Sequence, residues 1–234
     1  MGSGGRPSAQ AVALDAAVAA LLIGYHGGVH GRGARHHRVA ANLTVAGTAL
    51  AAARAAGIGA DELGLARGRI GAGLRTGALG AAGVAAILAA ASAWAPSREA
   101  LASTPDDPED LAFAVFVRVP FETALAEELL FRGVEYALAR RHGSHRYATL
   151  VTTIGFGLWH VGPALRRSRR HRDAAAPATV PHGVAVDVGV TALANVLLVG
   201  LRRRSGSVLA PVLVHAAVNA GALTVPALLG WIRE

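Results

Sequence analysis

Residues 119–133 read VPFETALAEELLFRG, which places two adjacent carboxylates, Glu127 and Glu128, inside an otherwise apolar stretch. On insertion scales, one such group at the centre of a membrane helix costs about 2.5–3.5 kcal/mol. Two such carboxylates are therefore expected to have interaction partners and a function. Two later apolar segments carry polar residues of their own, including His160 and His215. The pattern predicts a reaction centre inside the membrane.

The composition of the chain is that of a membrane protein. Of its 234 residues, 53% are hydrophobic and only 16% are charged, and the mean hydropathy is +0.40. Soluble domains carry about 25% charged residues. Alanine and glycine are abundant, and small residues let membrane helices approach closely. The length suits one helical bundle.

The net charge is +8. The sequence contains no lysine, so its 23 basic side chains other than histidine are all arginines. The arginines gather between apolar runs, at 32–38, 140–146, 166–172 and 202–204. Loops that flank a bilayer place arginines in this way, against lipid headgroups. We expect no nucleic-acid partner, since the chain has no basic recognition helix and no aromatic stacking platform. The absence of cysteine excludes disulfides and cysteine-based metal sites.

Apolar runs of about 20 residues match a hydrocarbon core of roughly 30 Å. They lie at 11–29, 40–58, 78–95, 111–141, 147–165, 183–201 and 207–231. The segment 61–75 mixes charged with apolar residues and is predicted to be an interfacial amphipathic element. Pro120 removes a backbone donor and is expected to bend the long helix 111–141. We predict an all-α, polytopic transmembrane bundle of about seven to eight helices.

The predicted organisation has three parts. Residues 1–10 form a flexible N-terminus, 11–110 hold the N-terminal transmembrane helices and the amphipathic segment, and 111–234 form the core that carries the polar motifs. A signal peptide is the alternative for 11–29, but this run is long for one and further spans follow it. Polar loops are expected at 98–110 and 166–182.

Helical spacing organises the polar residues. Glu128 and Arg132 are four residues apart with the acid first, which is the favourable order for an ion pair on one helix face. Glu127 is then rotated by about 100° and faces a different neighbour. The same four-residue spacing places Phe156 with His160, and His215 with Asn219, on shared faces. From their depths in the predicted spans, these side chains are expected to meet near the middle of the membrane.

These residue types suit hydrolysis of an amide bond. A glutamate beside a histidine can polarise a water molecule, with the carboxylate taking the proton. A second histidine and an asparagine on another helix can donate hydrogen bonds to a developing oxyanion. No covalent nucleophile is required. Other polar residues of the spans are interpreted as structural or interhelical contacts, and Trp159 as packing; the structural set is Asp15, His26, Glu122, Glu135, Asp187 and Asn195.

Three motifs in this order resemble the signatures of the CPBP intramembrane proteases, a family that joins CAAX prenyl endopeptidases with bacteriocin-processing and immunity proteins. The motifs are Glu127-Glu128-x-x-x-Arg132, Phe156-x-x-x-His160 and His215-x-x-x-Asn219. The flanking sequences LLFRG at 129–133 and SVLAP at 207–211 agree as well. The resemblance covers roughly 120–219, and the N-terminal third shares only hydrophobic helices with the family.

The resemblance implies an all-helical membrane endopeptidase in which residues 111–234 are the catalytic core. Glu127 and His160 would activate the water, while His215 and Asn219 would form the oxyanion hole. The site-supporting residues would be Glu128, Arg132 and Phe156. The expected partners are membrane lipids and a peptide or protein substrate, lipidated or membrane-bound. We predict a multi-pass protein of the plasma membrane that uses no cofactor.

Three alternatives stay open. Glu127, His160 and His215 could instead bind zinc, although no HExxH is present and Asn219 is a better oxyanion donor than zinc ligand. The chain could also be a non-catalytic immunity or peptide-binding protein that uses the same cavity. A transporter or proton relay is the third alternative, and the inverted repeats that would point to it are not visible in the sequence.

Overall fold

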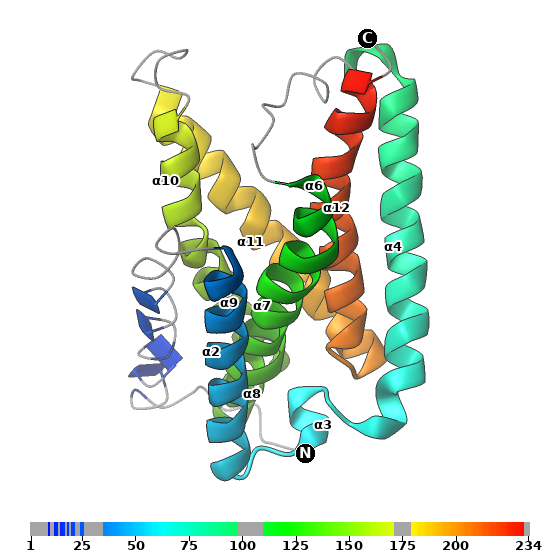
Figure 1. The fold of residues 1–234 in the computed structure, drawn as a ribbon. Helices are drawn as coiled ribbons and strands as arrows, with labels where there is room; N and C mark the ends of the chain where they lie inside the picture. The colour runs from blue at the N-terminus through cyan, green and yellow to red at the C-terminus, as the bar shows by residue number, and fades with distance from the viewer. Residues whose placement is uncertain are drawn as a thin grey trace.

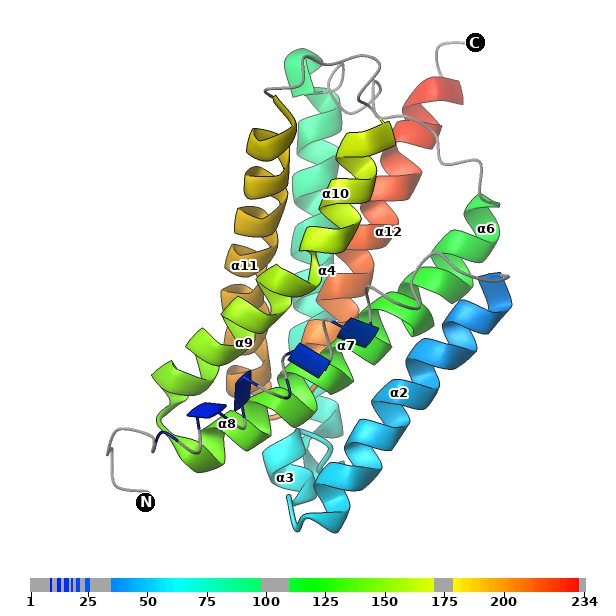
Figure 2. The same cartoon turned by 90° about the vertical axis from the view of Figure 1, so that its left-hand side faces the viewer.

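The computed structural model describes residues 35–97, 110–170 and 179–231, together with single positions between 9 and 25. Every regular element in these ranges is a helix and none is a strand, which confirms the predicted all-α class. Figures 1 and 2 show the helices running lengthwise through one bundle. The predicted flexible stretch 1–10, apart from Ala9, and the predicted loop 98–110, apart from Asp110, lie outside the described residues.

The first half of the bundle contains α2 (Arg35–Ala55), the short α3 (Ala60–Leu63), a 3₁₀ turn η1 (Arg67–Arg69) and α4 (Ile70–Ala93). A continuous helix follows, built from α6 (Leu111–Phe113), η2 (Ala114–Leu125), α7 (Ala126–Glu128), η3 (Leu129–Glu135) and α8 (Tyr136–His142). We call residues 111–142 the central helix. The chain ends with α9 (His145–Trp159), α10 (Val161–Arg170), α11 (Thr179–Ser205) and α12 (Leu209–Trp231).

The central helix begins at an N-cap residue, Asp110. The side chain of Asp110 accepts a hydrogen bond from the backbone N–H of Ala112 at 3.0 Å, which satisfies a donor that the first turn would leave unpaired. Its segments η2 and η3 have the wider π-helical pattern. Pro120 lies inside η2, and a π-helical stretch lets the helix continue past a residue that has no N–H to donate.

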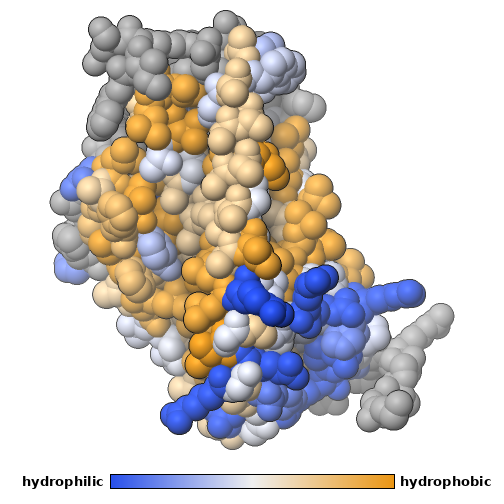
Figure 3. Space-filling view, turned by 90° about the vertical axis from the view of Figure 1, so that its right-hand side faces the viewer, coloured by the Kyte–Doolittle hydropathy of each residue, from blue (hydrophilic) through white to orange (hydrophobic). Residues whose placement is uncertain are grey.

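The central helix contributes more buried side chains than any other helix, and it contacts α2, α9, α11 and α12. The surrounding helices turn apolar side chains outward. Among the described residues, four helical segments are long and apolar enough to cross a membrane: Ala60–Ala93, His145–Arg166, Gly183–Ser205 and Leu209–Leu229. Large apolar residues such as Leu79, Ile87 and Leu197 are about two-thirds exposed. The chain is built as an integral membrane protein, with an apolar surface that Figure 3 shows over α4 and α12.

Helix α4 lies against α12 at close range (Figure 1). A Cβ atom at Gly77 would stand 2.7 Å from Leu213 Cδ1 and 3.1 Å from the Cα of Ala210. Gly73 approaches Ser207 in the same way, one turn earlier. This is the small-residue packing that membrane helices use in place of a hydrophobic driving force. The contact therefore depends on the absence of side chains at these positions.

The structure corrects three predicted boundaries. The segment 61–75 is not one amphipathic element, because Gly64 ends α3 with a positive φ of 74° and α4 already begins at Ile70. Residues 166–170 belong to α10 rather than to a loop, and α11 begins at Thr179. The remainder of the predicted loop, 171–178, lies outside the described residues. The three-part division at residues 10 and 110 stays a prediction.

The predicted helix 147–165 is interrupted at His160, which ends α9 and precedes α10. Its backbone N–H bonds to the carbonyl of Gly157 at 3.1 Å, which is a tightened 3₁₀-type turn. Pro163 has no N–H to offer to the carbonyl four residues before it, so one hydrogen bond of the α-helical ladder is missing at this point. The interruption places His160 at a corner between two helices.

We predict that Gly77→Ala destabilises the protein by about 1–3 kcal/mol, because the added methyl group meets backbone atoms of α12 that cannot move aside. Gly83→Ala is the matched control, since a Cβ at Gly83 on the same helix has nothing within 4 Å. The control should be neutral or slightly stabilising. Thermal unfolding of both variants in detergent measures the difference, and equal midpoints would contradict the close approach of α4 and α12.

Candidate active site

An ion pair lies at the centre of the bundle. Arg132 Nη1 is 3.0 Å from Glu128 Oε1, and both side chains are completely buried. The pair forms along one face of the central helix, as the four-residue spacing predicts. A buried charge without a partner would destabilise the fold strongly, so each of these two groups makes the other tolerable in an apolar interior.

His215 of α12 reaches both acids of the central helix. Its Nδ1 is 2.8 Å from Glu128 Oε1, and its Nε2 is 4.0 Å from Glu127 Oε2. A carboxylate only accepts, so Nδ1–H is the donor in the shorter contact. The distance of 4.0 Å is too long for a direct hydrogen bond. Glu128 therefore fixes the imidazole ring and aims its second nitrogen at Glu127.

Glu127 receives its own hydrogen bond from α9. The indole Nε1–H of Trp159 donates to Glu127 Oε1 at 3.1 Å, and the same ring packs edge-on against Phe131 with centroids 5.4 Å apart. The glutamate is 6% exposed. One carboxylate oxygen of Glu127 thus faces Trp159 and the other faces His215.

The role of Trp159 was missed in the sequence, where it is interpreted as packing. A buried indole N–H needs an acceptor, and an apolar span offers few besides the two acids. A tryptophan immediately before the motif histidine could therefore have been proposed as a partner of Glu127 from this requirement alone.

The ring of Phe156 contacts both histidines and the buried arginine. Its ring centroid is 4.5 Å from that of His160 and 6.2 Å from that of His215. The guanidinium carbon of Arg132 lies 4.1 Å from the same centroid, in cation–π geometry. One aromatic side chain thus fixes the distance between α9, α12 and the central helix.

The ring of His160 is oriented by its own helix. Its Nδ1 lies 2.8 Å from the backbone carbonyl of Phe156. A carbonyl only accepts, so Nδ1 carries the hydrogen, and Nε2 of the neutral ring is an acceptor. A histidine held in this tautomer can accept a proton from a water molecule.

The contacts bring six of the predicted site residues into one cluster: Glu127, Glu128, Arg132, Phe156, His160 and His215. No hydrogen bond or ion pair joins Glu127 directly to His160 within the described ranges. Asn219 lies one turn beyond His215 on α12 and is half-buried. Its side chain makes no hydrogen bond within the part of the chain that the structure describes. The catalytic roles of these residues stay a prediction.

A small hollow opens beside His160. It has a volume of about 180 Å³ and lies between α10 and α11, where its walls also include Pro163, Asp187 and Thr191. The corner between α9 and α10 lets the imidazole ring border this space. The volume accommodates a peptide side chain together with a few water molecules.

Zinc binding by Glu127, His160 and His215 stays an alternative, although two of these side chains stand further apart than zinc ligands do. Donors about 2.0–2.2 Å from a tetrahedral metal stand roughly 3.4 Å from one another, whereas His215 Nε2 and Glu127 Oε2 are 4.0 Å apart. Within the residues that the structure describes, no three histidine or acidic side chains form a group that could hold a metal ion.

Polar residues outside the cluster make structural contacts. Asn195 of α11 donates to Thr152 at 3.2 Å and to Thr153 at 2.8 Å on α9, which confirms the predicted interhelical contact. Asp15 binds His142 at 2.9 Å and Tyr147 at 2.7 Å, so it ties the N-terminal segment to the turn between α8 and α9. His26 lies outside the described residues.

Two further acids are buried away from the two histidines. Glu122 lies 3.5 Å from Arg38 of α2. Glu135 is 1% exposed and faces α9, where a Cβ atom at Gly155 would stand 2.7 Å from its Oε1. Neither makes a hydrogen bond or ion pair to His160 or His215 within the described ranges.

We expect Arg132→Met to lower the free energy of unfolding by about 3–5 kcal/mol, because Glu128 would stay buried without its cation. Arg146→Met removes the same charge from an exposed position at one end of α9 and should change stability by less than about 0.5 kcal/mol. Denaturation in detergent compares the two. A similar loss in both variants would contradict the importance of the buried pair.

Residues 109–221 match the model of the family described as type II CAAX prenyl endopeptidase Rce1-like. The matched segment includes all three motifs and every residue of the cluster. No curated protein and no solved structure matches the chain. The match confirms the resemblance drawn from the motifs, and it places the segment that carries the candidate site in the Rce1-like family of type II CAAX prenyl endopeptidases.

Proposed function

We propose that this protein is an intramembrane endopeptidase that hydrolyses a peptide bond with an activated water molecule. The observation that carries the proposal is the environment of Glu127, a buried carboxylate held by Trp159 on one oxygen and faced by His215 on the other. A carboxylate fixed in this way and faced by a histidine is equipped to remove a proton from water.

Glu127 is the proposed general base. Its Oε2 is buried and has no hydrogen-bond partner within the described part of the chain, so this oxygen is available to a water molecule. The Trp159 N–H fixes the other oxygen and keeps the carboxylate in one orientation. His160, with Nε2 as the acceptor, is the proposed second contact of the attacking water.

His215 and Asn219 are the proposed oxyanion donors. His215 gives its Nδ1–H to Glu128, so it can donate to an oxyanion only from Nε2, in its doubly protonated form. Asn219 adds an amide N–H₂ one helical turn further along α12, where a donor to the same oxygen would lie.

The proposed mechanism needs no metal. The base takes a proton from water as the oxygen attacks the peptide carbonyl, and the proton then passes to the leaving amine as the C–N bond breaks. Glu128, Arg132 and Phe156 hold the geometry and do not exchange protons with substrate.

The proposed substrate is a peptide or protein that reaches the site from the membrane. The family match supports a protein substrate, and the position of the cluster among apolar helices supports one that is lipidated or membrane-bound. We also propose that the protein resides in the plasma membrane.

We predict that Glu127→Gln lowers kcat/KM for peptide cleavage at least 100-fold, because general bases contribute about 10²–10⁴-fold. The measurement uses the full chain in liposomes with prenylated and unmodified C-terminal peptides, and mass spectrometry of the products. His160→Ala should cause a similar loss.

Glu135→Gln is the matched control, since it makes the same change at another buried position of the central helix. It should keep cleavage within a few-fold of the unmodified protein. Cleavage by Glu127→Gln at the level of this control would refute the assigned base. Preserved peptide binding without any turnover in the unmodified protein would favour the non-catalytic alternative.

A chelator separates the metal-free mechanism from the zinc-dependent one. Incubation with 1,10-phenanthroline or EDTA, followed by assay of the same peptides, should leave the cleavage rate unchanged. Loss of activity that added zinc restores would instead assign Glu127, His160 and His215 to a metal.

A further inference from the structure

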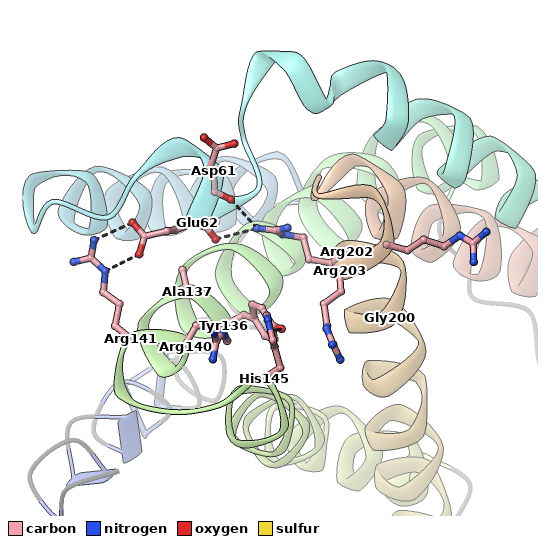
Figure 4. Close-up of a pocket in the computed structure, with 11 residues that line it drawn as sticks. Asp61, Glu62, Tyr136, Ala137, Arg140, Arg141, His145, Gly200, Arg202 and Arg203 are labelled. Atoms are coloured by element: carbon pink, nitrogen blue, oxygen red, sulfur yellow. Dashed lines mark hydrogen bonds and ion pairs between the residues drawn. The ribbon is translucent and has the colours of Figure 1, made fainter. Parts of the chain in front are cut away.

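A second cavity lies at the end of the bundle where α8 and α11 end and α9 begins (Figure 4). Its volume is about 620 Å³, within the usual range of small-molecule sites. Its walls include five arginines and two acids. The arginines are Arg140, Arg141, Arg202, Arg203 and Arg204, and they come from two different helices.

Two of these arginines are held in place by α3. Arg202 donates from Nη2 to the backbone carbonyls of Glu62 at 2.9 Å and Asp61 at 3.3 Å. Arg141 donates to both carboxylate oxygens of Glu62, at 2.8 and 2.9 Å. These contacts build a rigid rim, and the carbonyl contacts of Arg202 leave its positive charge without a counter-ion.

Two further arginines flank an aromatic pair in the wall. Figure 4 shows Arg140 and Arg203 on either side of Tyr136 and His145. The hydroxyl of Tyr136 and Nδ1 of His145 are 2.8 Å apart. Arg203 is exposed and makes no hydrogen bond or ion pair within the described residues. Arg140 donates one hydrogen bond, from Nη1 to the backbone carbonyl of Gly143. The concave site therefore presents the unbonded guanidinium of Arg203 and the remaining N–H groups of Arg140.

The charge balance favours an anion. Of the two acids in the wall, Glu62 is already paired with Arg141, and Figure 4 shows the carboxylate of Asp61 directed away from the arginines. Guanidinium groups bind phosphate oxygens in bidentate fashion, with several N–H donors available to one ligand.

The position of the cavity distinguishes it from the candidate active site. Three spans end or begin around it, so it lies at the membrane surface, where phosphates of lipid headgroups are found. The hollow beside His160 opens between α10 and α11, toward the opposite end of the bundle (Figure 1). The two spaces share no lining residue.

We propose that this cavity binds a phosphate group, carried by an anionic lipid headgroup or by a small soluble phosphate. Arg203 and Arg140 hold the phosphate oxygens, and Arg202 adds its charge from the rim. The bound group connects the central helix with α11, and thereby stabilises the end of the bundle. This inference does not depend on the proposed hydrolysis.

The test measures thermal unfolding of the full chain in an uncharged detergent. The probes are short-chain phosphatidylglycerol, short-chain phosphatidylcholine, glycerol phosphate, inorganic phosphate and hexaglutamate. Phosphatidylglycerol should raise the midpoint more than phosphatidylcholine does. Stabilisation by glycerol phosphate or inorganic phosphate at similar concentrations identifies a soluble ligand, and stabilisation by phosphatidylglycerol alone identifies a lipid.

Arg203→Gln should weaken the response to the effective probe about tenfold, as expected for one charge-assisted hydrogen bond. This side chain is exposed and unbonded, so the variant should fold normally, and Arg140→Gln provides a second position. Arg146→Gln removes an exposed arginine at the same end that does not line the cavity, and its response should be unchanged.

Three results would overturn the proposal. They are the absence of any shift with phosphate probes, equal weakening in Arg203→Gln and Arg146→Gln, and equal stabilisation by hexaglutamate. The last result would show that the arginines bind acidic peptides without preference for phosphate.

Discussion

One oxygen atom organises the interior of this protein. Glu128 Oε1 forms an ion pair with Arg132 at 3.0 Å and accepts a hydrogen bond from His215 at 2.8 Å. The first contact makes the buried acid tolerable in an apolar interior, and the second attaches α12 to the central helix and sets the direction of the imidazole ring. Arg132 in turn lies over Phe156 of α9. Three helices therefore take their relative positions from one carboxylate.

The sequence predicts the helical class, most of the spans and the pairing of Glu128 with Arg132. These features depend on local rules, because backbone groups in a bilayer must be satisfied within a helix and residues four apart share a face. The convergence of the three motifs was also predictable, since polar groups in apolar helices must find one another. The roles of Glu127 and Asn219 in catalysis are chemical inferences that stay open to experiment.

Features that depend on contacts between helices were not predictable from pattern alone. The hydrogen bond from Trp159 to Glu127 requires a particular rotation of α9 against the central helix. The corner at His160 comes from Pro163, which lies three residues further along the chain. Its effect on the helix could have been predicted from the sequence. The early start of α4 was hidden by Arg75, whose exposed side chain lies at a helix end without interrupting the span. In each case tertiary packing or a backbone effect outweighed average hydropathy.

The sharing of a single acceptor oxygen also restricts how such a core can evolve. Replacing either Glu128 or Arg132 alone leaves an uncompensated charge in a dry interior, although an apolar replacement of both could pack well. No series of single, individually tolerated steps connects the two solutions. Homologues that had lost the chemistry would therefore be expected to retain this ion pair for structural reasons, and its presence alone would not distinguish a working enzyme from an inactive descendant.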